Sequence, residues 1–322
     1  MNTAIPPPSL STLQHLTWEG SLPLRIRLAP GESRSYDKTD PYLTHAPRLT
    51  YLPFLLPRLH GFFANSLIED AASVAPEDGW FSFEGVPLKW HYPVGLLYDL
   101  FSGADASVRG EGHGLGLHAS GLQEHPGGAV LPWELEVHFS DWPEEQLVRL
   151  DAEGRVMEDA FINGVKEADF LRNGTAKGIM SLSKDDSTRF WRAVQDHDFT
   201  MYNSVNQKLL NPPGAILRNI PLKIYLPSSS LVEGDAIDEN ATEATAQQGS
   251  LRVVQSPIPP ALSERSALQQ LLPSLFPSRR TATLARAVLH GTVLPLTAPL
   301  EEVMRSAAYM DGWIHLSVMM MG

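Results

Sequence analysis

The chain has 322 residues, of which 43% are hydrophobic and 19% charged, so it has the composition of a globular protein with room for two or three domains. Its formal net charge of -12 argues against a nucleic-acid partner, because phosphate binding needs concentrated Lys and Arg. The absence of cysteine excludes disulfides, thiolate zinc sites and a cysteine nucleophile. No apolar run or N-terminal pattern predicts a membrane span or a secretory signal, so we expect a soluble intracellular chain.

The N-terminal third predicts a lead-in and then a small sheet with one covering helix. Residues 1–16 are rich in Pro and Ser, and predict a loose segment with at most one short helix. Leu24, Ile26 and Leu28 alternate with arginines, which is the pattern of a half-buried strand. The predicted order is strand, strand, helix, strand, short helix, strand, at 22–30, 48–54, 56–70, 80–90, 93–100 and 131–140.

The C-terminal third predicts the same order a second time. Leu222, Ile224 and Leu226 alternate with polar neighbours in its first strand, and Ser263 is placed to cap its helix. The expected elements lie at 216–227, 251–257, 263–276, 285–295, 298–309 and 313–321. Two such units predict an α+β protein with two ubiquitin-like β-grasp domains, in each of which one helix covers the apolar face of a mixed sheet.

The segment between these units predicts a helix-rich domain. Helical spacing is expected at 143–150, 156–174 and 185–210, and Asp185 and Asp186 suit a helix N-terminus. The chain therefore divides into a lead-in, a first ubiquitin-like domain, a helix-rich domain and a second ubiquitin-like domain, at 1–16, 17–141, 142–213 and 214–322. A Gly-rich insert at about 103–128 and an acidic insert at about 228–250 predict mobile loops.

The sequence contains no recognisable catalytic or metal-binding motif. The glycines between 110 and 116 lack the following helix that a phosphate-binding loop requires. Three histidines share the same loop without acids at ligand spacing, and the other histidines are scattered singly, which favours local hydrogen bonding. There is no G-x-S-x-G motif. We expect no cofactor and no catalytic residue, and the residues alone favour a binding or scaffold protein.

The stretch "NGVKEADFLRNG" (163–174) raises a separate question about its lysine. On a helix over 156–173, Phe161, Val165 and Ala168 share a packing stripe with Arg172, whose stem could snorkel to solvent. Lys166 falls at the border of this stripe. Phe170 points away from the core, which indicates a surface that a partner covers. Spacing alone favours an ordinary snorkelling lysine.

Several blocks of the sequence resemble the autophagy protein 5 family. They include "EGVPLKWHYPVGLLYDL" (84–100), "LPWELEVHFSDWP" (131–143), "VKEADFLRNG" (165–174) and "FWRAVQDHDFTMYNSVNQKLL" (190–210). The resemblance runs in order from about Trp18 to the end and leaves out the two inserts. It implies two ubiquitin-like domains flanking a helix-rich domain, in agreement with the pattern above.

The resemblance also implies a function and a site residue. In that family the lysine that begins the "KEAD" run forms an isopeptide bond with the ubiquitin-like autophagy protein 12, and the matching residue here is Lys166. The conjugate binds the coiled-coil autophagy protein 16. It then acts like an E3 ligase for the transfer of the ubiquitin-like autophagy protein 8 to a membrane lipid. The implied location is cytoplasmic, and peripheral on the preautophagosomal or isolation membrane.

The chemistry of conjugation leaves an alternative open. A free lysine has a pKa of about 10.4, yet its amine must lose a proton to attack the thioester that the E2-like enzyme carries. Glu167 and Asp169 would favour the charged ammonium, so we expect recognition or surface roles for them. Lys177 and Lys184, in a looser connector, compete by accessibility. The alternative is an adaptor whose ubiquitin-like domains bind partners while Lys166 stays unmodified.

Overall fold

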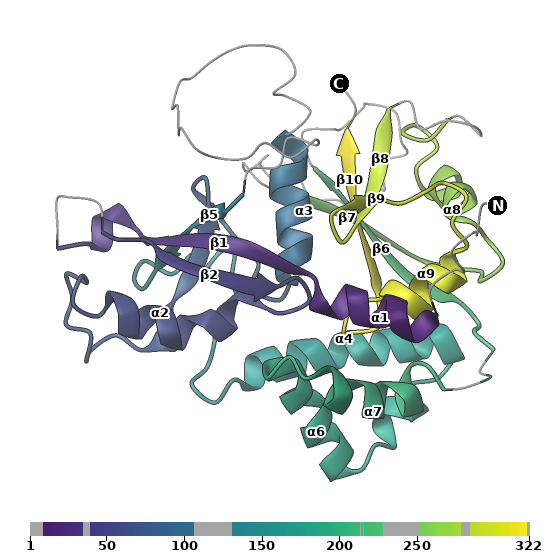
Figure 1. Cartoon of the computed structure of the whole chain (residues 1–322), viewed down its shortest axis with the longest axis horizontal. Helices are drawn as coiled ribbons and strands as arrows, with labels where there is room; N and C mark the ends of the chain where they lie inside the picture. The colour runs from purple at the N-terminus through teal and green to yellow at the C-terminus, as the bar shows by residue number, and fades with distance from the viewer. Residues whose placement is uncertain are drawn as a thin grey trace, which may run out of the picture.

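The computed structural model describes residues 9–34, 39–105, 131–212, 214, 216–227, 251–277 and 284–320 (Figure 1). In the first domain, helix α1 (Leu10–Glu19) precedes a sheet whose apolar face packs against both helix α2 (Leu56–Phe63) and helix α3 (Val94–Asp105). The strands are β1 (Ser21–Leu28), β2 (Tyr42–Pro47), β3 (Trp80–Phe83), β4 (Val86–Pro87) and β5 (Trp133–His138).

The topology of this sheet confirms the first β-grasp domain. The strands lie in the order β2-β1-β5-β3-β4, and the first and last strands of the unit, β1 and β5, are parallel neighbours. Leu24 and Ile26 of β1 pair with Trp133 and Leu135 of β5, and all four side chains are buried. The alternation read from the sequence therefore places one face of each central strand in the core.

The second ubiquitin-like domain repeats this arrangement. Its strands are β6 (Ile220–Pro227), β7 (Leu251–Ile258), β8 (Ala285–Leu289), β9 (Thr292–Val293) and β10 (Ile314–Met320), in the order β7-β6-β10-β8-β9. Strands β6 and β10 are parallel, as β1 and β5 are in the first domain. Helices α8 (Glu264–Leu271) and α9 (Leu300–Ala307) complete the unit. The predicted α+β class with two ubiquitin-like domains is confirmed.

The helix-rich domain lies between the two sheets in sequence and beneath them in the view of Figure 1. It consists of α4 (Arg155–Asn173), α5 (Lys177–Met180), α6 (Lys184–Gln195) and α7 (Phe199–Leu209). Asp185 and Asp186 occupy the first turn of α6, as predicted, and Ser183 caps it by accepting a hydrogen bond from the backbone N–H of Asp186. No helix in the described part of the chain is long and apolar enough to cross a membrane.

Helix α3 joins the two ubiquitin-like domains, since it packs on its own sheet and also against β10, β6 and β8 (Figure 1). Asp99 of α3 carries the polar part of this contact. Its carboxylate pairs with Arg48 and accepts a 2.8 Å hydrogen bond from the backbone N–H of Gly291, while its backbone carbonyl accepts from the Ser317 hydroxyl. A buried ion pair of the first domain therefore lies at the interface, where it accepts a hydrogen bond from the second domain.

Five element predictions were wrong. The strands expected at 80–90 and 285–295 are each a hairpin of two strands, β3 with β4 and β8 with β9, because the chain turns at two successive residues with positive φ, Glu84 and Gly85 or His290 and Gly291. The second strand lies at Tyr42–Pro47 and not at 48–54, because the latter residues turn into a short 3-10 helix that begins at Leu52 with Pro53 in its first turn. Residues 143–150 form turns instead of a helix. The helix expected over 185–210 is two helices, which break where His197 adopts a left-handed φ of 52° and Asp198 caps α7.

Two further predictions need a more limited correction. The lead-in at 1–16 does contain one helix, but α1 runs on to Glu19, and residues 1–8 lie outside the described part. Ser263 is the residue before α8, yet its hydroxyl bonds to the Ser266 hydroxyl and caps no backbone N–H. The insert at 228–250, and 106–128 of the Gly-rich insert, also lie outside the described residues, while 103–105 end α3.

Candidate acceptor lysine and its surroundings

Lys166 lies on the fourth turn of α4, at the edge of the helix's buried stripe. Phe161, Val165 and Ala168 are buried, as their spacing predicted, and Val165 and Ala168 are both 0% exposed. Lys166 itself is partly exposed, and Phe170 one turn further on is 56% exposed. The predicted border position of Lys166 and the outward position of Phe170 are therefore confirmed.

The ammonium group of Lys166 makes only one weak contact among the described residues. Its Nζ lies 3.5 Å from the side-chain oxygen of Asn163, at the limit of a hydrogen bond, and it forms no ion pair with any residue in the described ranges. The neighbouring Glu167 instead pairs with Lys223 of β6, at 3.4 Å. The amine of Lys166 can therefore be approached from solvent without first breaking a salt bridge.

The surface role expected for Asp169 is wrong, because this residue is fully buried. Its carboxylate accepts a 3.0 Å hydrogen bond from the backbone N–H of Ile179 and a 2.7 Å bond from the Asn173 amide. Helix α5 approaches so closely that a Cβ on Gly178 would lie 2.8 Å from the Asp169 carboxylate. The side chain thus joins α4 to α5, in the turn that follows Lys166.

The snorkelling role expected for Arg172 is also wrong. The residue is 0% exposed, and its guanidinium donates to the carbonyl oxygens of Leu210 at 2.8 Å and Gly312 at 2.6 Å, and to the Asn211 side chain at 3.3 Å. Burial lowers the pKa of Arg172 to about 10. Arg172 connects α4, the end of α7 and the second ubiquitin-like domain. Its position in the middle of the apolar stripe was the feature of the sequence that indicated a buried residue.

The second ubiquitin-like domain holds α4 close to Lys166. The Trp313 indole N–H donates a 2.9 Å hydrogen bond to the carbonyl oxygen of Gly164, and the Lys223 ammonium lies 4.0 Å from the centre of the Trp313 ring. A Cβ on Gly164 would lie 3.5 Å from the Asp311 side chain, an ordinary van der Waals contact, so the approach does not itself require a glycine. The glycine that weakens the helix by propensity is thus a contact point between domains.

A cavity of about 100 Å³ opens beside this contact, where all three domains meet. On its wall the Tyr225 hydroxyl bonds to Nδ1 of His315 at 2.8 Å, and Nε2 of His315 bonds to the Asp311 carboxylate at 2.9 Å. Burial opposes ionisation of Asp311, but the charge and hydrogen bond of His315 outweigh it and lower the pKa of the carboxyl. These bonds connect β6, β10 and the loop that carries Trp313.

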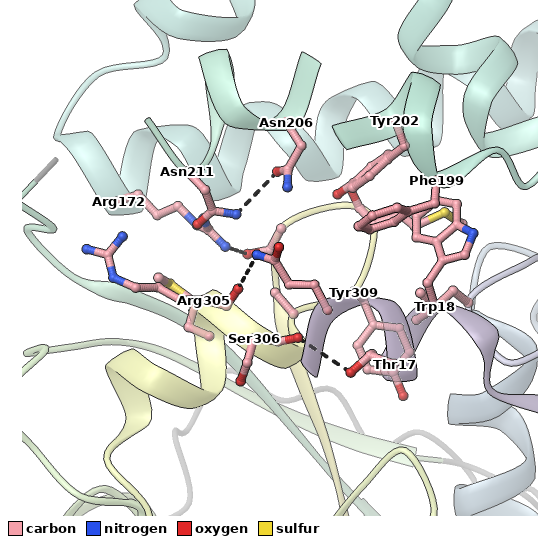
Figure 2. Close-up of a pocket in the computed structure, with 16 residues that line it drawn as sticks. Thr17, Trp18, Arg172, Phe199, Tyr202, Asn206, Asn211, Arg305, Ser306 and Tyr309 are labelled. Atoms are coloured by element: carbon pink, nitrogen blue, oxygen red, sulfur yellow. Dashed lines mark hydrogen bonds between the residues drawn. The ribbon is translucent and has the colours of Figure 1, made fainter. Parts of the chain in front are cut away.

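A second cavity, of about 40 Å³, lies where α1 crosses between α7 and α9 (Figure 2). Figure 2 shows Trp18 packed among Phe199 and Tyr202, with Arg305 and Ser306 of α9 opposite. The Gln14 amide donates to the Arg305 carbonyl at 2.8 Å, and the Trp18 indole N–H donates to the His197 carbonyl at 3.2 Å. Helix α1 therefore ties the helix-rich domain to the second ubiquitin-like domain.

The other lysines differ in their surroundings. Lys177 and Lys184 are exposed as expected, but they lie at the starts of α5 and α6, so the looser connector predicted for them is wrong. Lys89 is also exposed, whereas Lys208 pairs with Asp186 at 3.3 Å. Lys38 lies outside the described residues. Exposure alone therefore leaves Lys89, Lys177 and Lys184 as competitors of Lys166.

The structure also brings a serine and a histidine together in a nucleophile–base arrangement that sequence reasoning missed. The Ser82 hydroxyl is 2.8 Å from Nε2 of His138, and Nδ1 of His138 is 3.8 Å from the Glu32 carboxylate. Ser82 is only 1% exposed, however, and His138 is stacked on the Trp80 ring at 3.8 Å. Burial lowers the pKa of His138 to about 4. No substrate can reach this serine, so the cluster joins β3 to β5.

The local hydrogen bonding expected of the other histidines is confirmed for His290 and His315 but not for His60, whose Nε2 is buried without a partner among the described residues. His290 bonds to the Ala307 carbonyl at 2.8 Å, whereas the histidines of the Gly-rich insert lie outside the described residues. Within the described ranges, no group of three His, Asp or Glu side chains is arranged to hold a metal ion.

Three family models match the chain in succession. Autophagy protein ATG5, UblA domain, matches residues 17–139; its alpha-helical bundle region matches 154–212; and its UblB domain matches 219–318. Autophagy protein 5 of Aspergillus terreus is 54% identical over 333 residues, covering 98% of each chain, and that of Phaeosphaeria nodorum is 48% identical over 318 residues, covering 97% of this chain and 98% of the relative.

The fold is also found in a solved relative. The crystal structure of Kluyveromyces marxianus Atg5 matches with a TM-score of 0.67 at 20% identity, over 95% of this chain and 98% of that one. With three family models in order along the chain and relatives identical at about half of their positions, the chain belongs to the autophagy protein 5 family.

Proposed function

We propose that this chain is the acceptor and scaffold of a ubiquitin-like conjugation reaction in autophagy, with Lys166 as the acceptor. The proposal rests on the sequence position, the exposure and the contacts of the Lys166 side chain. Lys166 begins the "KEAD" run, is partly exposed, and among the described residues its amine makes no contact stronger than one of 3.5 Å to Asn163. Lys208 and Lys223, in contrast, are held in ion pairs.

The proposed reaction is an acyl transfer. The deprotonated Nζ of Lys166 attacks the thioester carbonyl that joins the C-terminal glycine of autophagy protein 12 to a cysteine of its E2-like carrier. The C–N bond forms and the C–S bond breaks, so that the carrier leaves as a thiolate, and the proton lost by the amine passes to solvent or to the carrier. This chain supplies the nucleophile and its position, and the carrier supplies the activated acyl group.

The conjugate would then act as a scaffold. We propose that it binds the coiled-coil autophagy protein 16 and stimulates transfer of autophagy protein 8 to phosphatidylethanolamine, in the cytoplasm and peripherally on the isolation membrane. Family membership supports these partners. The alternative is an unmodified adaptor that uses the same two ubiquitin-like domains only to bind proteins.

The test replaces single lysines by arginine in cells that lack the endogenous chain. Lys166→Arg keeps the positive charge and removes the usable nucleophile, so the conjugate should disappear and autophagy protein 8 should stay unlipidated. Lys177→Arg and Lys184→Arg are matched controls on helical sites that are more exposed than Lys166, and both should conjugate normally. Normal conjugation of Lys166→Arg would refute the assignment, and a wild-type chain that never carries the modifier would favour the adaptor.

A further inference from the structure

Two contacts from the second ubiquitin-like domain hold α4 on either side of Lys166. Two residues before it, the Gly164 carbonyl accepts the hydrogen bond from Trp313. One residue after it, Glu167 pairs with Lys223. Lys223 and Trp313 lie on β6 and in the loop before β10, whose strands are parallel neighbours. The segment that presents the acceptor amine is therefore held by a domain other than its own.

The residues that make these contacts are themselves fixed. Trp313 is 0% exposed, so its indole N–H has one direction in which to donate. The Lys223 side chain is 19% exposed and lies over the Trp313 ring, which restricts it to the side of α4 that carries Glu167. The Glu167 side chain is 55% exposed, so the charge pair is screened like a surface salt bridge, and the position of Lys223 is fixed by its packing over the Trp313 ring.

We propose that Lys223 and Trp313 are positioning residues for Lys166, a role that rests on the conjugation proposed above. Glu167 faces the second ubiquitin-like domain. Lys166 lies on a different side of the helix, and its amine forms no ion pair with any described residue. The Glu167–Lys223 pair therefore fixes the rotation of α4 while it leaves the nucleophile free. The anchor at Gly164 fixes the same turn at the point where the helix is weakest.

The physical reason is the geometry that acyl transfer requires. The attacking nitrogen must come within about 3–3.5 Å of the thioester carbon in line with its orbitals, and a small displacement of the nucleophile reduces the rate steeply. The carrier docks as a large rigid body, so it cannot follow a helix that rotates or frays. A small acylating reagent in solution can approach the amine from many directions. Its reaction rate therefore reports the intrinsic reactivity of the Lys166 amine, whereas the conjugation rate also depends on the position of that amine.

The test is a charge exchange in the full-length chain, with conjugation reconstituted from purified activating and carrier enzymes. Lys223→Glu and Glu167→Arg each place like charges together, and each should slow conjugation at Lys166 by about threefold to tenfold. The double variant restores an opposite-charge pair without adding a lysine, and should recover most of the rate. Lys223→Arg should conjugate like wild type, and Trp313→Phe should be slowed because it lacks the indole N–H.

Two controls separate a failure of this inference from a failure of the proposed function. Arg192→Glu, Asp196→Arg and their double variant alter an exposed pair on α6, and should leave the rate unchanged. Acetylation of Lys166 by a small soluble ester, followed by mass spectrometry, should proceed as in wild type in Trp313→Phe, which changes no charge near the amine. Equal conjugation rates in the single exchange variants, or acetylation that falls in parallel with conjugation, would overturn the positioning role. Continued conjugation of Lys166→Arg would instead overturn the proposed function.

Discussion

The Trp313 indole N–H donates a 2.9 Å hydrogen bond to the Gly164 carbonyl, which links the second ubiquitin-like domain to the helix that carries Lys166 two residues later. Arg172, on the same helix, reaches the Gly312 carbonyl in the same loop. The loop at 311–313 thus contacts α4 at two places about two turns apart. The acceptor helix is part of the interface between domains, so mutations in that loop should affect both stability and conjugation.

Arg172→Met should lower the free energy of unfolding by about 2–4 kcal/mol, because the change leaves the Leu210 and Gly312 carbonyls buried without their donor. Arg172→Lys should recover little, since a single ammonium group cannot reproduce the guanidinium fork. The measurement is urea denaturation followed by tryptophan fluorescence. Arg189→Met, on the exposed side of α6, is the control and should change stability by less than about 0.5 kcal/mol. Equal effects at Arg172 and Arg189 would contradict the internal role.

Gly312→Ala should destabilise the protein by more than about 1 kcal/mol, because Gly312 has a φ of 83° and an added Cβ would lie 2.8 Å from a methyl carbon of Leu210. It should also slow conjugation, since the adjacent Trp313 would shift relative to Gly164. Thermal unfolding and the reconstituted assay measure the two effects. Gly61→Ala is the matched control: it lies in α2 with open space around it, and should be neutral or stabilise by up to about 1 kcal/mol. A Gly312→Ala protein as stable as wild type would refute the strain argument.

Acid should destabilise the fold through His290. Its Nε2 bonds to the Ala307 carbonyl, while its Nδ1 is buried with no partner among the described residues, and burial lowers the pKa of His290 from 6.5 to about 4. Between these values the unfolded chain binds the proton and the folded chain does not. Stability is therefore full above pH 6.5 and falls as the pH drops toward 4, by on the order of 3 kcal/mol at most from this residue.

The measurement is the free energy of unfolding between pH 7 and about pH 4 for wild type and His290→Gln. Glutamine keeps an N–H donor for Ala307 and cannot titrate in this range, so its loss of stability with falling pH should be shallower. Other histidines continue to contribute; burial lowers the pKa of His91 to about 4 as well, so the slope should not vanish. Identical slopes in both proteins would show that His290 is not a source of the pH dependence.

The sequence alone predicted most of the order of elements and of the two sheets, because their strands have one apolar face, as Leu24 and Ile26 show. It missed β4 and β9, which are two-residue strands that follow β3 and β8 after tight turns. It misplaced the second strand, because Tyr51 and Leu52 look like strand residues although they are buried in a turn and a 3-10 helix. The break near His197 had a readable signal in Asp198, whose side chain suits a helix start.

The candidate site was predictable in part. Helical periodicity placed Lys166 at the border of the buried stripe and Phe170 outside it, and both positions are confirmed. The same reasoning treated Asp169 as a surface residue and Arg172 as a snorkelling one, because periodicity along one helix cannot show which other segments pack on it. Helix α5 covers Asp169, and the loop at Gly312 covers Arg172. Both contacts depend on tertiary structure.

The central claim is tested most directly by the peptide that carries the modifier. Trypsin cuts an unmodified chain after Arg155, Lys166 and Arg172, whereas an isopeptide bond at Lys166 blocks the middle cut. Mass spectrometry of the chain purified from its own cells during autophagy should therefore find residues 156–172 as one branched peptide, with the C-terminal residues of autophagy protein 12 attached to Lys166. A conjugate whose branch lies on Lys89, Lys177 or Lys184, while residues 156–166 and 167–172 appear fully cleaved, would contradict the account.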